Sequence, residues 1–350
     1  MWMVILLALL TVIAQSESVP FELAQNIIIA KGSLNGREAT WIVDTGASGC
    51  VVTPKAARAA GIDGDRTGVA RSMGAGQATV RDLTVAILEP KVADFIRKAG
   101  VDYTGILGTP YLEQFLVTLD YGAKRLVLAP PDARAPDGPG ADIQLQKGLI
   151  FLDVRYGDGT LRMLLDSGAQ AAVVLPSAAE RLRIPLKTVP GHPDASVADI
   201  DLAIGDTKAP GVIVAVQEPP QIRDMERAGL KCDGFLGYTF LGRYRTTIDY
   251  RRKRVRFEPL SKTGGPPEEP AAERPALGWS LSDAKVDAVD AGGLAEKAGF
   301  RAGDIIVSID KQSVTVIEEI RAILTAAKPG STFTIVVRRG SEQVTLSLKW

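Results

Sequence analysis

The sequence contains a single histidine, His192, among 350 residues. A single imidazole could serve one Ser-His-Asp hydrolase site, and no histidine would then remain for another role. It also cannot form a zinc site that needs several histidine ligands. Cysteine is also scarce, with Cys50 and Cys232 the two in the chain. We therefore expect no metal ion and no cofactor, and we interpret the two cysteines as inert thiols.

Neither sign of charge is in excess, because Lys plus Arg and Asp plus Glu both number 41. A balanced chain has no general attraction to nucleic acid, which we do not expect as a partner. The apolar run from Met3 to Ala14 is too short to span a bilayer, and small residues follow it. We interpret residues 1–16 as a signal peptide for export to the periplasm or beyond, with no stable membrane insertion after cleavage. The run lacks a preceding Lys or Arg, so an uncleaved anchor is the alternative.

What the sequence does contain is a repeat around an aspartate. Trp41-Ile42-Val43-Asp44-Thr45-Gly46-Ala47 is matched 122 residues later by Met163-Leu164-Leu165-Asp166-Ser167-Gly168-Ala169. Further on, Gly105-Ile106-Leu107-Gly108 recurs 129 residues later as Gly234-Phe235-Leu236-Gly237. A carboxylate at the end of a buried strand is costly to desolvate. Residues that break the local rules of folding in this way are expected at functional sites. Two copies predict a closed pseudo-dimer in which equivalent patches of the two halves meet.

The Asp-Thr/Ser-Gly triplet, followed by an apolar-apolar-Gly segment, resembles the aspartic proteases, both the pepsins and the retroviral proteases (retropepsins). The resemblance covers roughly residues 21 to 260 and is present in both halves. The short spacing between the halves and the Ala after each triplet are most similar to two fused retropepsin subunits. The resemblance implies a mostly β, bilobal fold with pseudo-twofold symmetry, in which residues 20–131 form lobe 1 and residues 142–260 form lobe 2.

In this family two aspartates share one proton, and we expect Asp44 and Asp166 to do so because neighbouring carboxylates cannot both ionise cheaply. One aspartate activates a water and the other stabilises the substrate carbonyl. The resemblance implies that Thr45 and Ser167 reach across the pseudo-twofold axis and lock the pair. It also implies that Gly46 and Gly168 permit a tight turn and bring amide donors near the carboxylates. For either motif alone, an ordinary turn at a strand end is the alternative.

The glycine-rich segment Thr67 to Gln77 predicts a hairpin. In the family a hairpin covers the substrate, and we place this candidate flap at Met73 and Gly74, with a plain connecting hairpin as the alternative. The second half has seven additional residues between Ile184 and Glu218, where a second flap would lie.

A different module follows a Pro-rich and acidic linker at residues 261–275. The run Ala298-Gly299…Ala302-Gly303-Asp304-Ile305-Ile306 closely resembles a bacterial PDZ domain, and the resemblance covers residues 276–350. It implies an α/β domain with a short helix at 294–300 and a second helix near 316–326. Leu277, Gly278 and Trp279 stand where the family's carboxylate-binding loop would be, which implies extended or C-terminal peptides as partners. A vestigial groove that only packs on the lobes is the alternative.

We therefore hypothesise an exported aspartic endopeptidase that acts on peptide or protein substrates and carries a peptide-binding PDZ domain. A catalytically silent envelope adaptor that binds peptides through both modules is the alternative from another class, and a structural scaffold is a third. The presence of both Asp44 and Asp166 favours the enzyme, because an adaptor needs neither carboxylate.

Overall fold

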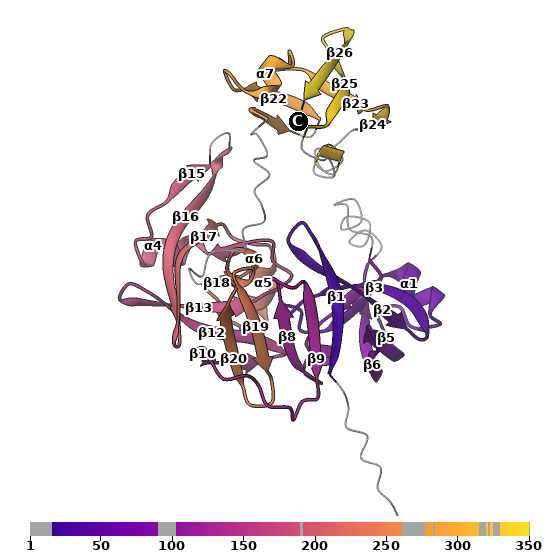
Figure 1. Cartoon of the computed structure of the whole chain (residues 1–350), viewed down its shortest axis with the longest axis vertical. Helices are drawn as coiled ribbons and strands as arrows, with labels where there is room; N and C mark the ends of the chain where they lie inside the picture. Colours follow the sequence, from indigo (N-terminus) through magenta and orange to yellow (C-terminus); the bar gives the residue numbers. More distant parts are fainter. Residues whose placement is uncertain are drawn as a thin grey trace, which may run out of the picture.

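The computed structural model describes residues 16–89, 103–189, 192–260, 277–282, 284–314, 320, 323–324 and 330–349. The chain is mostly β, with two β lobes and a C-terminal α/β domain (Figure 1). Of the expected signal peptide only Ser16 lies among the described residues, and the expected linker at 261–275 lies outside them. Within the described ranges no helix is both long and apolar enough to cross a membrane.

Both lobes follow a common sequence of elements, to which lobe 2 adds β15 and α5 among the described residues. Lobe 1 contains β2 (Ile27–Leu34), β3 (Arg37–Val43), β4 (Cys50–Val52), α1 (Pro54–Ala59), β5 (Thr67–Ala75), β6 (Ala78–Ile87), β7 (Gly105–Leu107) and α3 (Thr109–Leu112). Lobe 2 contains β11 (Gln144–Gln146), β12 (Leu149–Tyr156), β13 (Gly159–Leu165), β14 (Ala172–Val174), α4 (Pro176–Arg181), β15 (Lys187–Val189), β16 (His192–Ile204), β17 (Thr207–Val216), α5 (Gln221–Arg227), β18 (Gly234–Leu236) and α6 (Tyr238–Leu241). Pro54 and Pro176 begin equivalent helices, where a missing N–H costs nothing.

Each lobe interleaves its strands in the same way. In lobe 1, β3 runs parallel to β7, β7 is antiparallel to β4, and β4 is parallel to β6. In lobe 2, β13, β18, β14 and β17 repeat this arrangement. The register pairs Val43 with Leu107 and Leu165 with Leu236. The end of each Asp-bearing strand is therefore fixed against the apolar-apolar-Gly segment, which explains why the sequence repeats both motifs together.

Six strands join the lobes in the order β10-β20-β19-β8-β9-β1 (Figure 1). They are β1 (Glu17–Ala24), β8 (Leu116–Asp120), β9 (Arg125–Ala129), β10 (Gly140–Asp142), β19 (Tyr244–Asp249) and β20 (Arg254–Pro259). At the centre, Thr118 pairs with Thr247, and their hydroxyl oxygens lie 2.9 Å apart. Because these threonines are equivalent in the repeat, the pseudo-twofold axis passes between them. Both lobes share one continuous hydrophobic core.

The candidate flap at Met73 and Gly74 is wrong. β5 pairs with β2, placing Met73 opposite Leu34 and Gly74 opposite Ser33, and Met73 is completely buried. The indole N–H of Trp41 donates to the Gly74 carbonyl at 2.8 Å. A Cβ at Gly74 would lie 2.6 Å from the Ala78 carbonyl oxygen. Glycine is therefore present for close packing, and the end of β5 at residues 73–75 belongs to the core of lobe 1.

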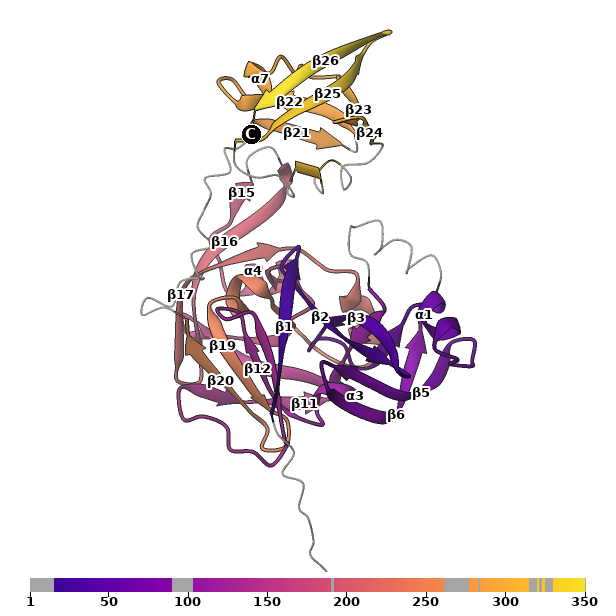
Figure 2. The same cartoon turned by 45° about the vertical axis from the view of Figure 1, so that its right-hand side comes forward.

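The additional residues of lobe 2 do form a hairpin. β15 pairs with the first part of β16, and the pair extends beyond the body of the lobe (Figure 2). Lobe 1 has no equivalent of β15 among its described residues. A covering role for β15–β16 stays a prediction.

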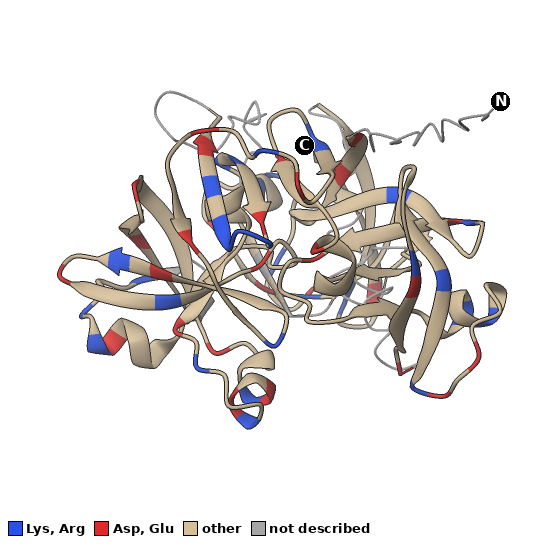
Figure 3. Cartoon of the chain, turned by 90° about the horizontal axis from the view of Figure 1, so that it is seen from below, with Lys and Arg blue, Asp and Glu red and all other residues tan. Residues whose placement is uncertain are grey.

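The C-terminal domain contains β21 (Trp279–Ser282), β22 (Lys285–Val289), α7 (Leu294–Lys297), β23 (Ile305–Ile309), β24 (Gln312–Ser313), β25 (Thr332–Arg339) and β26 (Glu342–Lys349). It has a hydrophobic core of its own, around Val286, Ile309 and Ile335. Of the second helix expected near 316–326, only Ile320, Ile323 and Leu324 are among the described residues. Acidic and basic residues alternate over the molecule without a large face of one sign in the view of Figure 3.

Candidate active site

The two lobes bring Asp44 and Asp166 together at the pseudo-twofold axis, and this pair is called the dyad below. Asp44 follows β3 and donates its amide to Leu107 O at 3.1 Å; Asp166 follows β13 and donates its amide to Leu236 O at 3.2 Å. The two carboxyl groups are within hydrogen-bonding reach of each other. Both are enclosed by protein atoms, yet both residues keep some surface accessible to solvent.

Gly46 and Gly168 make the close approach of the carboxyl groups possible. The Gly46 amide donates to Asp44 Oδ1 at 2.8 Å, and the Gly168 amide donates to Asp166 Oδ1 at 2.9 Å. A Cβ on Gly46 would lie 2.5 Å from the Asp166 carboxyl carbon, and a Cβ on Gly168 would lie 2.6 Å from that of Asp44. Neither glycine has a positive φ. The opposite carboxylate, rather than the turn expected from the sequence, is what requires glycine here.

Thr45 and Ser167 form a reciprocal set of hydrogen bonds across the axis. The Thr45 hydroxyl donates to Leu165 O at 2.9 Å and accepts from the Ser167 amide at 3.0 Å. The Ser167 hydroxyl donates to Val43 O at 2.8 Å and accepts from the Thr45 amide at 3.0 Å. Both residues are buried. Serine completes its half of the set without the methyl group of threonine, so each lobe holds the strand end of the other.

Burial raises the pKa of both carboxyl groups, and the negative charge of Asp44 raises the pKa of Asp166 further. The amides of Gly46 and Ala47 act against burial at Asp44, and those of Gly168 and Ala169 do so at Asp166. Because each charge disfavours the other, the pair holds a single proton over a wide pH range.

The surroundings of the pair are not symmetric. On one side, the β1–β2 turn reaches into lobe 2, where Gln25 and Asn26 hydrogen-bond Gln170 at 2.8 and 3.2 Å. On the other side, the equivalent turn brings Gly148 against Ser48, and the Thr109 hydroxyl donates to Gly148 O at 2.5 Å. Ser48 and Gln170 are equivalent in the repeat, so their difference changes how each turn crosses to the opposite lobe. The difference between Ser48 and Gln170 in the repeat predicts unequal hydrogen bonding around the pair, but the sequence does not identify these partners.

The loop expected to bind peptide termini in the C-terminal domain is ordered by its carbonyl groups. Leu277 O accepts from the Ala295 amide at 2.7 Å, and Gly278 O accepts from the Asp290 amide at 2.8 Å. Gly278 has φ +68 and lies against Gly293, so it cannot carry a side chain without strain. Trp279 packs edge-on against Phe300 with ring centroids 4.7 Å apart. β21 has a single neighbour, β22, in the described sheet.

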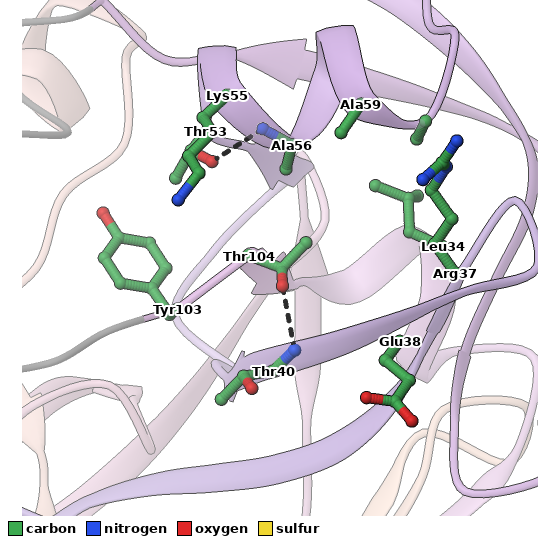
Figure 4. Close-up of a pocket in the computed structure, with 11 residues that line it drawn as sticks. Leu34, Arg37, Glu38, Thr40, Thr53, Lys55, Ala56, Ala59, Tyr103 and Thr104 are labelled. Atoms are coloured by element: carbon green, nitrogen blue, oxygen red, sulfur yellow. Dashed lines mark hydrogen bonds between the residues drawn. The ribbon is translucent and has the colours of Figure 1, made fainter.

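Two cavities lie beside the lobes, apart from the pair of aspartates. The first, of about 330 Å³, lies in lobe 1 beside Tyr103 and Thr104 (Figure 4). The second, of about 730 Å³, lies at the equivalent position of lobe 2, beside Cys232 and Asp233. No dyad residue lines either cavity. Across the described part of the chain, no group of His, Cys, Asp or Glu is arranged as a metal site.

Comparisons with known proteins agree with this architecture. A family model for an aspartyl protease matches residues 30–111, and a model for a PDZ domain matches residues 285–339. No curated protein matches the chain.

Solved structures provide partial matches. The HtrA3 PDZ domain bound to a phage-derived ligand is 22% identical over 20% of this chain and 65% of that chain, with a TM-score of 0.18. An aminopeptidase N family protein from Idiomarina loihiensis is 32% identical over 21% of this chain and 13% of that chain, with a TM-score of 0.20. Basic 7S globulin from soybean is 12% identical over 69% of this chain and 94% of that chain, with a TM-score of 0.42. This chain thus spans less than two thirds of the first two structures.

The family models, the duplicated motif and the interleaved strands lead to one description of the architecture. The chain carries a retropepsin-like aspartyl protease region, followed by a PDZ domain.

Proposed function

We propose that this protein is an aspartic endopeptidase whose PDZ domain binds substrate or partner peptides. The observation that carries the proposal is the adjacent pair of carboxyl groups of Asp44 and Asp166, held at the axis by the reciprocal bonds of Thr45 and Ser167. A binding protein has no use for two enclosed carboxyl groups whose mutual repulsion opposes folding.

The geometry supports general acid–base hydrolysis. The protonated member of the pair holds the shared proton and hydrogen-bonds the peptide carbonyl oxygen. The ionised member takes a proton from water as the water oxygen bonds to the carbonyl carbon. A proton then passes to the amide nitrogen, the C–N bond breaks, and the carboxyl product and the amine leave. The fixed amides of Gly46 and Gly168 keep both carboxyl groups in place throughout.

The PDZ domain is proposed to capture extended segments or chain ends. A peptide added beside β21 would continue the sheet on its open edge, and the loop at Leu277 and Gly278 would receive a terminal carboxylate. We also propose export, on the basis of the apolar run at residues 3–14. Cell fractionation and the mass of the mature N-terminus test export directly.

A fluorogenic peptide library tests the enzyme. Wild-type protein should cleave at least one peptide, and a pepstatin-type inhibitor should block the cleavage. Asp44→Asn and Asp166→Asn should each abolish it, whereas Asp158→Asn, at an exposed aspartate of the β12–β13 turn, should not. Peptide binding without cleavage at any pH from 3 to 8 would favour the silent adaptor.

A further inference from the structure

The interlobe hairpin of the second half carries arginines that its counterpart in the first half lacks. The β8–β9 hairpin contains Gly122-Ala123-Lys124-Arg125-Leu126-Val127, and the β19–β20 hairpin contains Arg251-Arg252-Lys253-Arg254-Val255-Arg256, 129 residues later. Lys124 and Arg125 recur, whereas the positions of Gly122, Ala123 and Val127 hold arginine in the second hairpin. The two hairpins pair with each other through β8 and β19 and have the same register. The fold of such a hairpin therefore does not require arginine at these three positions.

Two of the additional arginines line a small cavity. The cavity has a volume of about 150 Å³ and lies between the β19–β20 hairpin and residues 130–139, which connect β9 to β10. Its charged lining residues are Arg134, Asp137, Asp249, Arg252, Arg254 and Arg256. Neither aspartate of the dyad is among them, so the mechanism above does not use this cavity.

The connection between the lobes forms one wall of this cavity. The Arg252 guanidinium donates to Asp132 O at 3.3 Å and to Ala133 O at 3.1 Å. The Arg256 guanidinium donates to Gly138 O. The connection is thus held against the hairpin at two points, and Arg134 and Asp137 lie between them in the sequence.

The charge of Arg256 is the unusual feature of the cavity. The other three arginines have acidic partners: Arg252 pairs with Asp249 at 2.9 Å, Arg254 with Asp142 at 2.8 Å, and Arg134 with Asp137 at 3.1 Å. Arg256 is half-buried and forms no ion pair with any described residue. A neutral side chain could also donate to the Gly138 carbonyl, and a charge removed from water is unfavourable unless it is paired. Anchoring of the connection therefore explains a hydrogen-bond donor at this position but not a cation.

The cavity is suited to a small oxyanion. Its volume of about 150 Å³ is several times the share of one water molecule in the liquid, about 30 Å³. Arg254 and Arg256 are two residues apart on β20 and so extend from the same face of the sheet. Arg134 lines the cavity from the connection. A guanidinium donates paired N–H groups to phosphate oxygens, and three guanidinium groups around one cavity match a phosphate group better than a carboxylate with two oxygens.

We propose that this cavity binds a phosphate group, with Arg254 and Arg256 of β20 and Arg134 of the connection as its ligands. The bound anion neutralises Arg256 and joins the connection between the lobes to the interlobe sheet. Because the site shares no residue with the dyad, the inference does not depend on the proposed peptidase function. Inorganic phosphate and the phosphate of a lipid headgroup both have this chemistry, and the experiment distinguishes them.

The test is isothermal titration calorimetry of the full chain with inorganic phosphate at pH 7.5. Sodium chloride keeps the ionic strength constant, so that general screening of surface charges does not contribute. We expect saturable binding of one phosphate per chain. The melting temperature should rise with phosphate concentration, because a ligand that binds only the folded state stabilises it by mass action.

Three variants locate the site. Arg256→Val copies Val127 of the first hairpin and should fold, but it should weaken phosphate binding about tenfold or more because charged hydrogen bonds are lost. Arg134→Gln, at a side chain that is 83% exposed, should weaken binding without a change in the fold. Arg125→Gln is the matched control, since Arg125 is the repeat equivalent of Arg254 but does not line the cavity. It removes one positive charge from the same sheet and should bind phosphate like wild type.

Sedimentation with phosphatidylglycerol vesicles separates the two sources of phosphate. Binding of free phosphate that is lost in Arg256→Val supports a soluble ligand, whereas vesicle binding alone with the same dependence on Arg256 supports a lipid headgroup. The proposal is overturned if wild type binds neither probe, or if Arg256→Val and Arg134→Gln both bind as tightly as Arg125→Gln. If Arg256→Val does not fold, as judged by circular dichroism, Arg134→Gln decides.

Discussion

At the scale of single residues, ionisation of the dyad is needed for the proposed hydrolysis but lowers the stability of the folded protein. The folded state raises the pKa of Asp44 and Asp166 above the usual value of an aspartate, first through burial. Folding therefore binds protons that the unfolded chain releases at the same pH. The contribution of the pair to stability is fully present below the unfolded pKa and is lost as pH rises through the folded pKa.

The first prediction follows from this sign. Asp166→Asn should lower kcat at least about 100-fold, since a general acid is removed. The same variant should unfold at a higher temperature than wild type at pH 7, because a neutral amide replaces a carboxyl that resists ionisation. The two melting temperatures should converge near pH 3. Circular dichroism melts across this range provide the measurement, and a variant that is less stable at pH 7 would show that the proton is not shared.

The second prediction concerns the residues after the triplets. Ala47 and Ala169 can offer the dyad their amides but no hydroxyl. A hydroxyl donor would favour the charged form and lower the apparent pKa values of the pair. We expect the wild-type optimum between about pH 5 and 7, in a bell-shaped profile. In the double variant Ala47→Ser, Ala169→Thr the acidic limb should move to lower pH. A wild-type optimum near pH 3, or an unmoved limb, would assign control of the dyad to other groups.

At the scale of elements, the C-terminal domain depends on a buried ion pair. Asp304 precedes β23, and its side chain is 1% exposed. It accepts from Arg339 Nε at 2.7 Å and Nη2 at 2.8 Å, and from the Arg301 amide at 2.9 Å. Burial acts to raise the Asp304 pKa, but the hydrogen bonds from Arg339 and Arg301 lower it overall. This contribution to stability is therefore present above the unfolded pKa and is lost as pH falls through the folded one.

The third prediction is that Asp304→Asn destabilises the C-terminal domain by about 2–3 kcal/mol at pH 7, because charged Arg339 loses its partner. The loss should shrink in strong acid, where wild type is protonated as well. Urea unfolding followed by Trp279 fluorescence measures it. Asp142→Asn breaks the pair with Arg254, in which Asp142 is 86% exposed, and should cost less than about 1 kcal/mol. If the two variants lost equal free energy of unfolding, the buried ion pair of Asp304 would be no more important than the exposed pair of Asp142.

Elements also show where sequence reasoning succeeded and failed. The Asp44 and Asp166 motifs were identifiable because each combines a buried strand, a carboxylate and a paired downstream segment in a repeat. The flap prediction at Met73 and Gly74 was wrong because a glycine in a sequence can indicate either a mobile segment or close packing. At Gly74 the reason is close packing against the Ala78 carbonyl oxygen. β1 was not predicted as a strand, because its residues adjoin the apolar N-terminal run and pair with β9, far along the chain.

At the scale of the whole molecule, the two lobes act as one unit and the PDZ domain is separate. The lobes share a core and are joined by the strands β10-β20-β19-β8-β9-β1, whereas the PDZ domain has its own core. Loss of the PDZ domain should consequently leave the dyad assembled. A tethered binding site raises the local concentration of a substrate that can engage both modules at once. Short peptides cannot do so.

The last prediction separates recruitment from catalysis. Deletion of residues 276–350 should raise KM for an unfolded protein substrate about tenfold or more, while KM for a short peptide and kcat for both stay close to wild type. In the full chain, Gly278→Ala should reproduce part of this effect, because a Cβ there meets Gly293 at 2.9 Å on a backbone with φ +68. Gly340→Ala is the matched control, with φ +64 but no atom within 4 Å of the added Cβ. Equal changes for protein and peptide substrates would contradict recruitment and would indicate instead that the PDZ domain stabilises or inhibits the lobes.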